Sequence, residues 1–195
     1  MSEMSSWLKI IRFLMDNKEE SFSIRFISKK LGLNYRIAFE EIKKLEKEEI
    51  ISIKKLGNSN QCAFRYALSE KVFVAENSKK NDFLKNKALK VMYDRVMEIQ
   101  SPFFIFLIFG SYAKGTQTKQ SDIDLCLITD NPETDKKMQQ VIRLIPLKTH
   151  LMHFTTNDFM MMIKTNEQNV GKEMIKNNII LKGIESFYEL VNYAG

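Results

Sequence analysis

Asp122 and Asp124 are separated by a single residue and lead into a short apolar run, 125–128. A short apolar run bounded by polar residues predicts a buried strand. Side chains two residues apart on a strand point to the same face, so we expect the two carboxylates to converge. Converging carboxylates repel each other unless a cation relieves the repulsion. Oxygen ligands of this kind suit Mg²⁺, which commonly binds through one or two carboxylates and the phosphates of a substrate.

A second polar motif, Gly110-Ser111, ends the preceding apolar run, 103–109, which we expect to form another buried strand. Glycine lets the backbone approach a phosphate closely. The nearby N–H groups and the serine hydroxyl can donate hydrogen bonds to phosphate oxygens. Lys114 adds positive charge close by. A phosphate-binding turn beside a metal site is the equipment of phosphoryl or nucleotidyl transfer.

The two motifs, GSYAKG at 110–115 and SDIDL at 121–125, together resemble the signature of the DNA polymerase β-type nucleotidyltransferases and are similar to their minimal branch. The resemblance covers the chain from Phe103 to the C-terminus. It implies an enzyme that binds an NTP and two Mg²⁺ ions, with Mn²⁺ as the alternative metal. It also implies transfer of an NMP to a hydroxyl group with release of pyrophosphate, and we expect ATP as the donor and AMP as the transferred group.

The same resemblance assigns roles to individual residues. It implies that Asp122 and Asp124 are catalytic and hold the metal. It implies that Gly110, Ser111 and Lys114 bind the nucleotide.

The chain departs from the family pattern at residues 148–155, the third strand that we predict in this region. The resemblance implies a third carboxylate on this strand, whereas the stretch contains His150 and His153 and no acidic residue. Three accounts stay open: a histidine replaces the carboxylate, the protein works slowly with two carboxylates, or it binds a nucleotide without turning it over. On a strand, the spacing of three would place the histidines on opposite faces. Asp158 follows at an expected helix start, where we predict that it caps the helix.

Residues 1–75 show a different pattern, with three segments of helical periodicity followed by two strand-like segments around a turn at 57–60. This order resembles the winged helix-turn-helix superfamily. The resemblance implies that the helix at 34–48 enters the major groove of DNA. The predicted DNA-binding residues are Asn34, Tyr35, Arg36, Lys43, Lys54, Lys55 and Arg65.

An interaction or dimerisation module is the alternative for this region, because five glutamates lie on the helix at 34–48 and just after it, and they oppose phosphate binding. Residues 76–101 are predicted to connect the two domains. The polar stretch 76–81 is the expected boundary, and an apolar helix is expected from Asp82 to about Pro102. An exposed part of that helix would suit a homodimer.

The whole chain of 195 residues has a net charge of +6, and residues 1–80 account for +5 of it. This distribution agrees with a nucleic-acid partner for the N-terminal part. Cys62 and Cys126 lie in apolar contexts, which favours buried free thiols over a disulfide or a metal site. No apolar run reaches membrane-spanning length and no signal-peptide pattern is present, so we expect a cytoplasmic protein without a membrane partner.

The sequence therefore predicts an α+β or α/β protein with a winged helix over 1–75, a connector helix over 76–101 and a nucleotidyltransferase fold over 102–195. The last part is expected to have a small mixed sheet flanked by helices. The leading interpretation is a metal-dependent enzyme that transfers an NMP to a hydroxyl acceptor, such as one on a partner toxin. The alternative is a DNA-binding transcriptional regulator, or an antitoxin-like protein, whose nucleotidyltransferase fold is inactive or only binds a nucleotide.

Overall fold

The computed structural model describes residues 4–57, 59–101 and 103–194. Its backbone contacts divide the chain into two compact units, Met1–Ala75 and Glu76–Gly195. We call them the N-terminal unit and the C-terminal unit. Asn58 of the expected turn and Pro102 at the expected helix end lie outside the described residues. No helix in the described ranges is long and apolar enough to cross a membrane.

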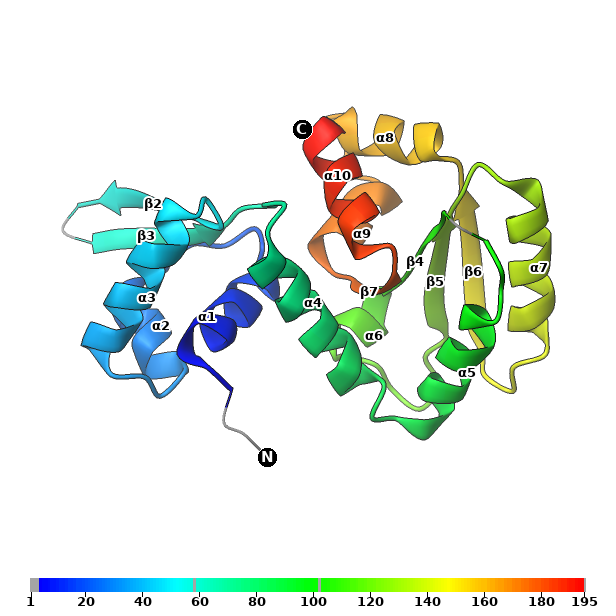
Figure 1. Ribbon diagram of the computed structural model, residues 1–195, viewed down its shortest axis with the longest axis horizontal. Coiled ribbons are helices and arrows are strands. Elements are labelled where there is room, and N and C mark those ends of the chain that lie inside the picture. Colours follow the sequence, from blue (N-terminus) through cyan, green and yellow to red (C-terminus); the bar gives the residue numbers. More distant parts are fainter. Residues whose placement is uncertain (1–3, 58, 102, 195) are drawn as a thin grey trace. The chain divides into compact units, whose positions relative to one another are not determined.

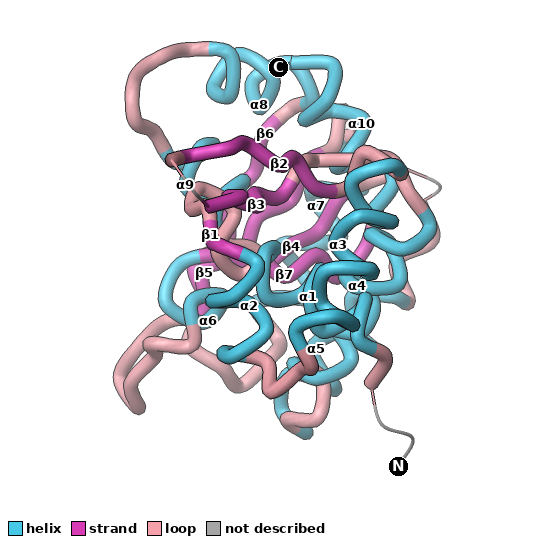
Figure 2. The backbone as a smooth tube through the Cα atoms, turned by 90° about the vertical axis from the view of Figure 1, so that its left-hand side faces the viewer, coloured by secondary structure: helices cyan, strands magenta, loops and turns pink. Residues whose placement is uncertain are grey.

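The N-terminal unit combines helices with a small antiparallel sheet (Figures 1 and 2). The strands are ordered β1-β3-β2. In chain order, the elements are α1 (Ser6–Met15), β1 (Phe22–Ser23), α2 (Ile24–Lys30), α3 (Tyr35–Lys47), β2 (Ile51–Leu56) and β3 (Ser59–Phe64).

Local sequence signals explain where the helices of this unit begin and end. Ser23 accepts a hydrogen bond from Phe26 N at 3.1 Å and so caps α2. Asn34 caps α3 in the same way, by accepting a hydrogen bond from Arg36 N at 2.9 Å. Gly32 has φ +63°, a left-handed conformation that suits glycine after a helix end. The helices bury one apolar stripe each, and the fully buried side chains include Ile10, Leu14, Ile27, Ala38, Ile42 and Leu45.

The stretch between the expected domains holds two helices rather than one, α4 (Glu70–Phe83) and α5 (Lys87–Met97). The polar residues 76–81, which the sequence predicts as the domain boundary, lie inside α4. Glu76 in this stretch is only 1% exposed and accepts a hydrogen bond from the Tyr188 hydroxyl at 2.7 Å. Asn86 caps α5 by accepting hydrogen bonds from the N–H groups of Ala88 and Leu89.

The C-terminal unit is built on a four-stranded sheet in the order β6-β5-β4-β7 (Figure 1). Strands β5 and β6 are parallel and the other pairs are antiparallel, so the sheet is mixed. The predicted combination of helices with small sheets is confirmed. The elements of the unit after α5 are β4 (Ile105–Phe109), α6 (Gly110–Lys114), β5 (Ile123–Ile128), α7 (Pro132–Arg143), β6 (Thr149–Phe154), α8 (Thr156–Lys164), α9 (Val170–Lys176), β7 (Ile179–Lys182) and α10 (Ile184–Ala194).

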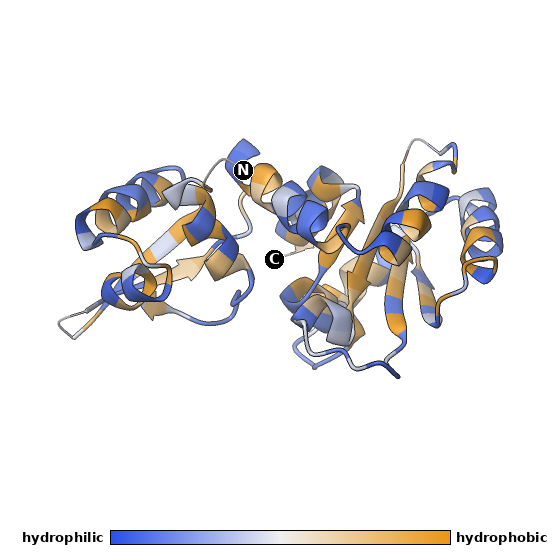
Figure 3. Cartoon of the chain, turned by 90° about the horizontal axis from the view of Figure 1, so that it is seen from below, coloured by the Kyte–Doolittle hydropathy of each residue, from blue (hydrophilic) through white to orange (hydrophobic). Residues whose placement is uncertain are grey.

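Two layers of helices cover this sheet. One face, which includes Phe106 and Leu125, packs against α5 and α7. The helices α8, α9 and α10 lie on the other side (Figure 1), where Phe159 of α8 packs against Phe187 of α10 with ring centroids 5.9 Å apart. The strands are mainly hydrophobic in Figure 3, as strands between two helical layers must be.

Both cysteines are free and buried, as the sequence predicts. Burial raises the pKa of the Cys62 thiol to about 11, and burial raises the pKa of Cys126 as well. Neither thiol is therefore prepared for nucleophilic or metal chemistry.

Candidate active site

Gly110 joins the end of β4 to the short helix α6, where the sequence predicts only a polar turn. Its φ is +66°, in the left-handed region. A β-carbon on Gly110 would lie 2.3 Å from Asp124 Oδ2. Strands β4 and β5 pair so that Phe109 lies opposite Asp124, which places the glycine directly beside that carboxylate. The absence of a side chain at residue 110 thus allows the GSYAKG turn and the SDIDL motif to meet.

The two aspartates stand at the start of β5. Asp124 lies within the strand and its side chain is 32% exposed, whereas Asp122 precedes the strand and its side chain is 55% exposed. Asp124 Oδ1 is 3.6 Å from His150 Nδ1, and Asp122 Oδ1 is 3.7 Å from Lys148 Nζ. Both carboxylates therefore have cationic or imidazole partners at the beginning of β6.

The two histidines of β6 lie in different surroundings, and only His150 is next to the aspartates. His150 is paired in register with Asp124 across β5 and β6, so it belongs to the candidate site. His153 lies on the opposite face of β6, as its spacing predicts. There its Nδ1 is 3.6 Å from Asp135 Oδ2 of α7, and its Nε2 is 3.1 Å from the carbonyl oxygen of Thr129. Only His150 remains a candidate replacement for the third carboxylate.

Asp158 caps α8, as predicted. Thr155 and Asp158 form a capping box in which the Asp158 carboxylate accepts hydrogen bonds from Thr155 N at 3.2 Å and Thr155 Oγ1 at 2.6 Å. These hydrogen bonds lower the pKa of Asp158. Because its carboxylate is committed to the cap, Asp158 does not supply the absent third carboxylate.

Lys114 stands at the end of α6, where its ammonium group is 2.6 Å from Glu173 Oε1 of α9. Glu173 is a neighbour that the sequence motifs did not indicate, because it lies 59 residues further along the chain. A phosphate at Lys114 would have to share or displace this ion pair. Gly110, in contrast, lies directly beside Asp124, and Ser111 follows it in the first turn of α6.

Asp122 and Asp124 are the donor set that the sequence predicts for a divalent cation. The close approach of Gly110 leaves a cradle over Asp124 that a β-carbon would fill. Within the described ranges, no group of three or more histidine, cysteine, aspartate or glutamate residues is arranged to hold a metal by itself. A protein usually binds Mg²⁺ through only one or two carboxylates, however, and water and substrate phosphates supply the remaining ligands. Asp122 and Asp124 are therefore the candidate metal ligands.

Residues 105–181, from the first residue of β4 into β7, match the family model described as a nucleotidyltransferase domain. The match supports the predicted nucleotidyltransferase domain over these residues. The finer assignment to the minimal DNA polymerase β-type branch stays a prediction. No curated protein and no solved structure gives a significant match to the chain. The winged-helix resemblance of residues 1–75 stays a prediction.

The predicted DNA-binding residues are dispersed over the N-terminal unit, and several have local ion-pair partners. Arg36 pairs with Glu40 at 3.0 Å, Lys43 with Glu46 at 2.8 Å, and Arg65 with Glu49 at 3.8 Å. Asn34 is occupied by the α3 cap, whereas Tyr35, Lys54 and Lys55 are exposed.

Sequence reasoning missed two cations on the same unit. Tyr35 lines a cavity together with Arg25 and Lys29 of α2. The signal for them was their i, i+4 spacing, which puts two positive side chains on one face of that helix.

Proposed function

We propose that the C-terminal unit transfers an NMP, with AMP expected, from an NTP to a hydroxyl acceptor. The observation that carries the proposal is the placement of Gly110 against Asp124. It brings the turn expected to bind phosphate next to the aspartate expected to bind the metal. The match of residues 105–181 to a nucleotidyltransferase domain supports NMP transfer in general.

The proposed reaction makes one bond and breaks one. The acceptor oxygen attacks the α-phosphorus, the bond from that phosphorus to the bridging oxygen breaks, and pyrophosphate leaves while the acceptor proton passes to solvent. A Mg²⁺ or Mn²⁺ ion bound to Asp122 and Asp124 would neutralise the phosphate charge that develops during transfer. The backbone at Gly110 and the Ser111 hydroxyl would hold phosphate oxygens through hydrogen bonds.

The experiment uses purified full-length protein with α-labelled ATP, GTP, CTP or UTP, Mg²⁺ or Mn²⁺, and host lysate as the source of acceptor. We expect label transfer by the wild type and its loss in Asp124→Asn. Asp94→Asn is the matched control, because Asp94 is an exposed aspartate on α5 that pairs with Lys90 of its own helix. Label transfer that persists in Asp124→Asn would contradict the proposal, as would a wild type that binds no nucleotide.

A second candidate function is that of a DNA-binding transcriptional regulator, or an antitoxin-like protein, whose nucleotidyltransferase fold binds nucleotide without turnover. It is favoured by the start of β6, where Lys148 and His150, not a carboxylate, face the aspartates. The Lys148 ammonium group would attract a polyphosphate, and neither Lys148 nor His150 supplies the oxygen ligand that a further Mg²⁺ ion would need. Metal-dependent ATP binding without label transfer, combined with a shift of DNA from upstream of its own gene, would identify this function. A partner toxin is the proposed acceptor if transfer is found, and a homodimer is proposed for the DNA-bound form.

A further inference from the structure

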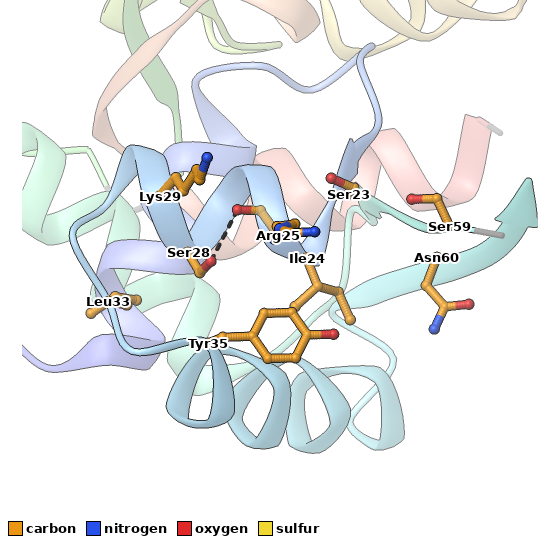
Figure 4. Close-up of a pocket in the computed structure, with 9 residues that line it drawn as sticks. All are labelled: Ser23, Ile24, Arg25, Ser28, Lys29, Leu33, Tyr35, Ser59 and Asn60. Carbon is orange, nitrogen blue, oxygen red and sulfur yellow. Dashed lines mark hydrogen bonds between the residues drawn. The ribbon is translucent and has the colours of Figure 1, made fainter.

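The N-terminal unit contains a cavity of about 800 Å³ between α2, the first residue of α3 and the sheet (Figure 4). Ile24 forms part of its apolar lining, and the ring of Tyr35 stands beside it. Arg25 and Lys29 line the same cavity from α2. Asn60 lines it from β3, on the side of the hairpin (Figure 4).

The charge of this cavity is wholly positive. None of its lining residues is acidic. Neither Arg25 nor Lys29 has a carboxylate within ion-pair distance in the part of the chain that the structure describes. Lys55 is paired in register with Asn60 across the hairpin, so a third cation lies on the strand beside the rim.

Helix α3 attracts an anion less strongly than the cavity does, because its positive and negative side chains nearly balance. Over Tyr35–Lys47 it carries four cations and three glutamates, and Glu48 and Glu49 follow at once. Three of these cations pair with glutamates along the helix: Arg36 with Glu40, Lys43 with Glu46, and Lys44 with Glu41 at 2.8 Å. Because summed charge and not single contacts attracts a polyanion, the cavity is the more favourable place for a phosphate.

Tyr35 adds a second recognition element. It is 54% exposed although it is a large aromatic residue at the mouth of a cavity. An exposed aromatic ring is a platform on which a base or sugar can stack, and such stacking is tolerant of sequence. The two cations suit a phosphate group and the neighbouring Tyr35 ring suits a planar base, so together they match a nucleotide.

We propose that this cavity binds one nucleotide unit of a nucleic-acid strand, with its phosphate on Arg25 and Lys29 and its base or sugar against Tyr35. The proposal rests on the DNA-binding part of the proposed function and not on NMP transfer. The same chemistry is present in a free nucleotide. A strand is favoured because Lys55 extends the positive surface beyond the space that one nucleotide fills.

The test measures binding of the full-length protein to fluorescently labelled mixed-sequence DNA by anisotropy, as a duplex and as a single strand, over a series of salt concentrations. Arg25→Ala/Lys29→Ala is expected to weaken binding about tenfold or more and to lower the slope of log K against log[salt] by roughly 1.8, the value for two lost phosphate contacts. Tyr35→Leu is expected to weaken binding, and Tyr35→Phe to retain it.

The charge-matched control is Lys85→Ala/Lys90→Ala, which removes two exposed lysines that pair with Asp82 and Asp94 in the C-terminal unit. It is expected to change the affinity by no more than about twofold. Equal losses in the two double variants would overturn the proposal, as would unchanged binding by the α2 variant or no binding by the wild type. Circular dichroism and thermal unfolding show that each variant is folded.

A competition arm separates the two sources of the ligand. Displacement of DNA by ATP or AMP in an Asp124→Asn background, with loss of that competition in the α2 variant, would assign the cavity to a free nucleotide. Displacement only by unlabelled nucleic acid would assign it to a strand. Label transfer is measured in parallel, because Arg25→Ala/Lys29→Ala is expected to leave it unchanged, so failure of one proposal is distinguishable from failure of the other.

Discussion

His150 Nδ1 lies 3.6 Å from Asp124 Oδ1, and the two residues are paired in register on the parallel strands β6 and β5. An imidazole therefore occupies the position next to the aspartate from which a further carboxylate could have reached a shared metal. An imidazole offers no oxygen ligand and no negative charge, whereas a carboxylate would add one negative charge and two oxygen ligands.

Replacing His150 by aspartate should convert the pair of carboxylates into a three-carboxylate site. We expect His150→Asp to bind Mn²⁺ about tenfold more tightly in the presence of ATP, which corresponds to roughly 1.4 kcal/mol. His150→Asn, which keeps a similar shape without a charge, is the control. Measuring free Mn²⁺ by electron paramagnetic resonance checks the prediction, and equal affinities for the two variants would refute it.

Gly110→Ala should damage both the site and the fold. The left-handed backbone would cost about 1–2 kcal/mol with an L side chain, and the new β-carbon would meet Asp124 at 2.3 Å. Urea unfolding should show this loss, and ATP binding should fall by more than the loss of folded protein explains. Gly57→Ala is a useful comparison, because Gly57 also has a positive φ but has open space around its position. If both variants lost nucleotide binding equally, contact with Asp124 would not be the cause.

Tyr188→Phe should destabilise the C-terminal unit, because it removes a hydrogen bond to the buried Glu76 carboxylate. The Tyr188 hydroxyl donates a 2.7 Å hydrogen bond to Glu76 Oε1, and Glu76 Oε2 is buried without a hydrogen-bond partner among the described residues. Removing this donor should cost about 1–3 kcal/mol of unfolding free energy. The double variant Tyr188→Phe/Glu76→Leu should recover part of the loss, because both polar groups are then gone. Chemical denaturation of the wild type, Tyr188→Phe, Glu76→Leu and the double variant checks this prediction. A double variant whose loss of unfolding free energy equals the sum of the two single losses would argue against it.

Asp158→Asn should lower the thermal stability at neutral pH. The hydrogen bonds from Thr155 lower the pKa of Asp158 in the folded protein, so its ionised form stabilises the fold above the ordinary pKa of 3.8. This contribution is lost as the pH falls through the folded-state pKa. The difference in Tm between the variant and the wild type should therefore shrink at pH values below 3.8. Glu167→Gln, at an exposed glutamate beyond α8, should show no such pH-dependent difference.

The sequence predicted the local elements well where one signal dominated. Asn34 and Pro132 mark helix starts by capping and by proline at the first turn. The apolar run before Gly110 forms the buried strand β4. The contact of Gly110 with Asp124 was not predicted, because the glycine was interpreted only as a place where the backbone approaches a phosphate.

The features that the sequence did not predict depend on contacts between residues far apart in the chain. Glu76 lies in a polar stretch that was predicted as a domain boundary, but it is buried in α4 and accepts a hydrogen bond from Tyr188, 112 residues away. Glu173 was not recognised as the partner of Lys114, since nothing local marks a glutamate on one helix as the neighbour of a lysine on another. Arg25 and Lys29 were missed because α2 was interpreted only through its apolar face.

The division between the two units falls inside α4, not in a loop, and this has a practical consequence for dissecting the protein. A truncation after Ala75 would cut a hydrogen-bonded helix and leave each fragment with part of it. The C-terminal fragment would begin at Glu76, where a frayed end would expose the carboxylate that accepts the hydrogen bond from Tyr188. Fragments that both include residues 70–83 would keep α4 whole and would allow each half to be tested for autonomous folding.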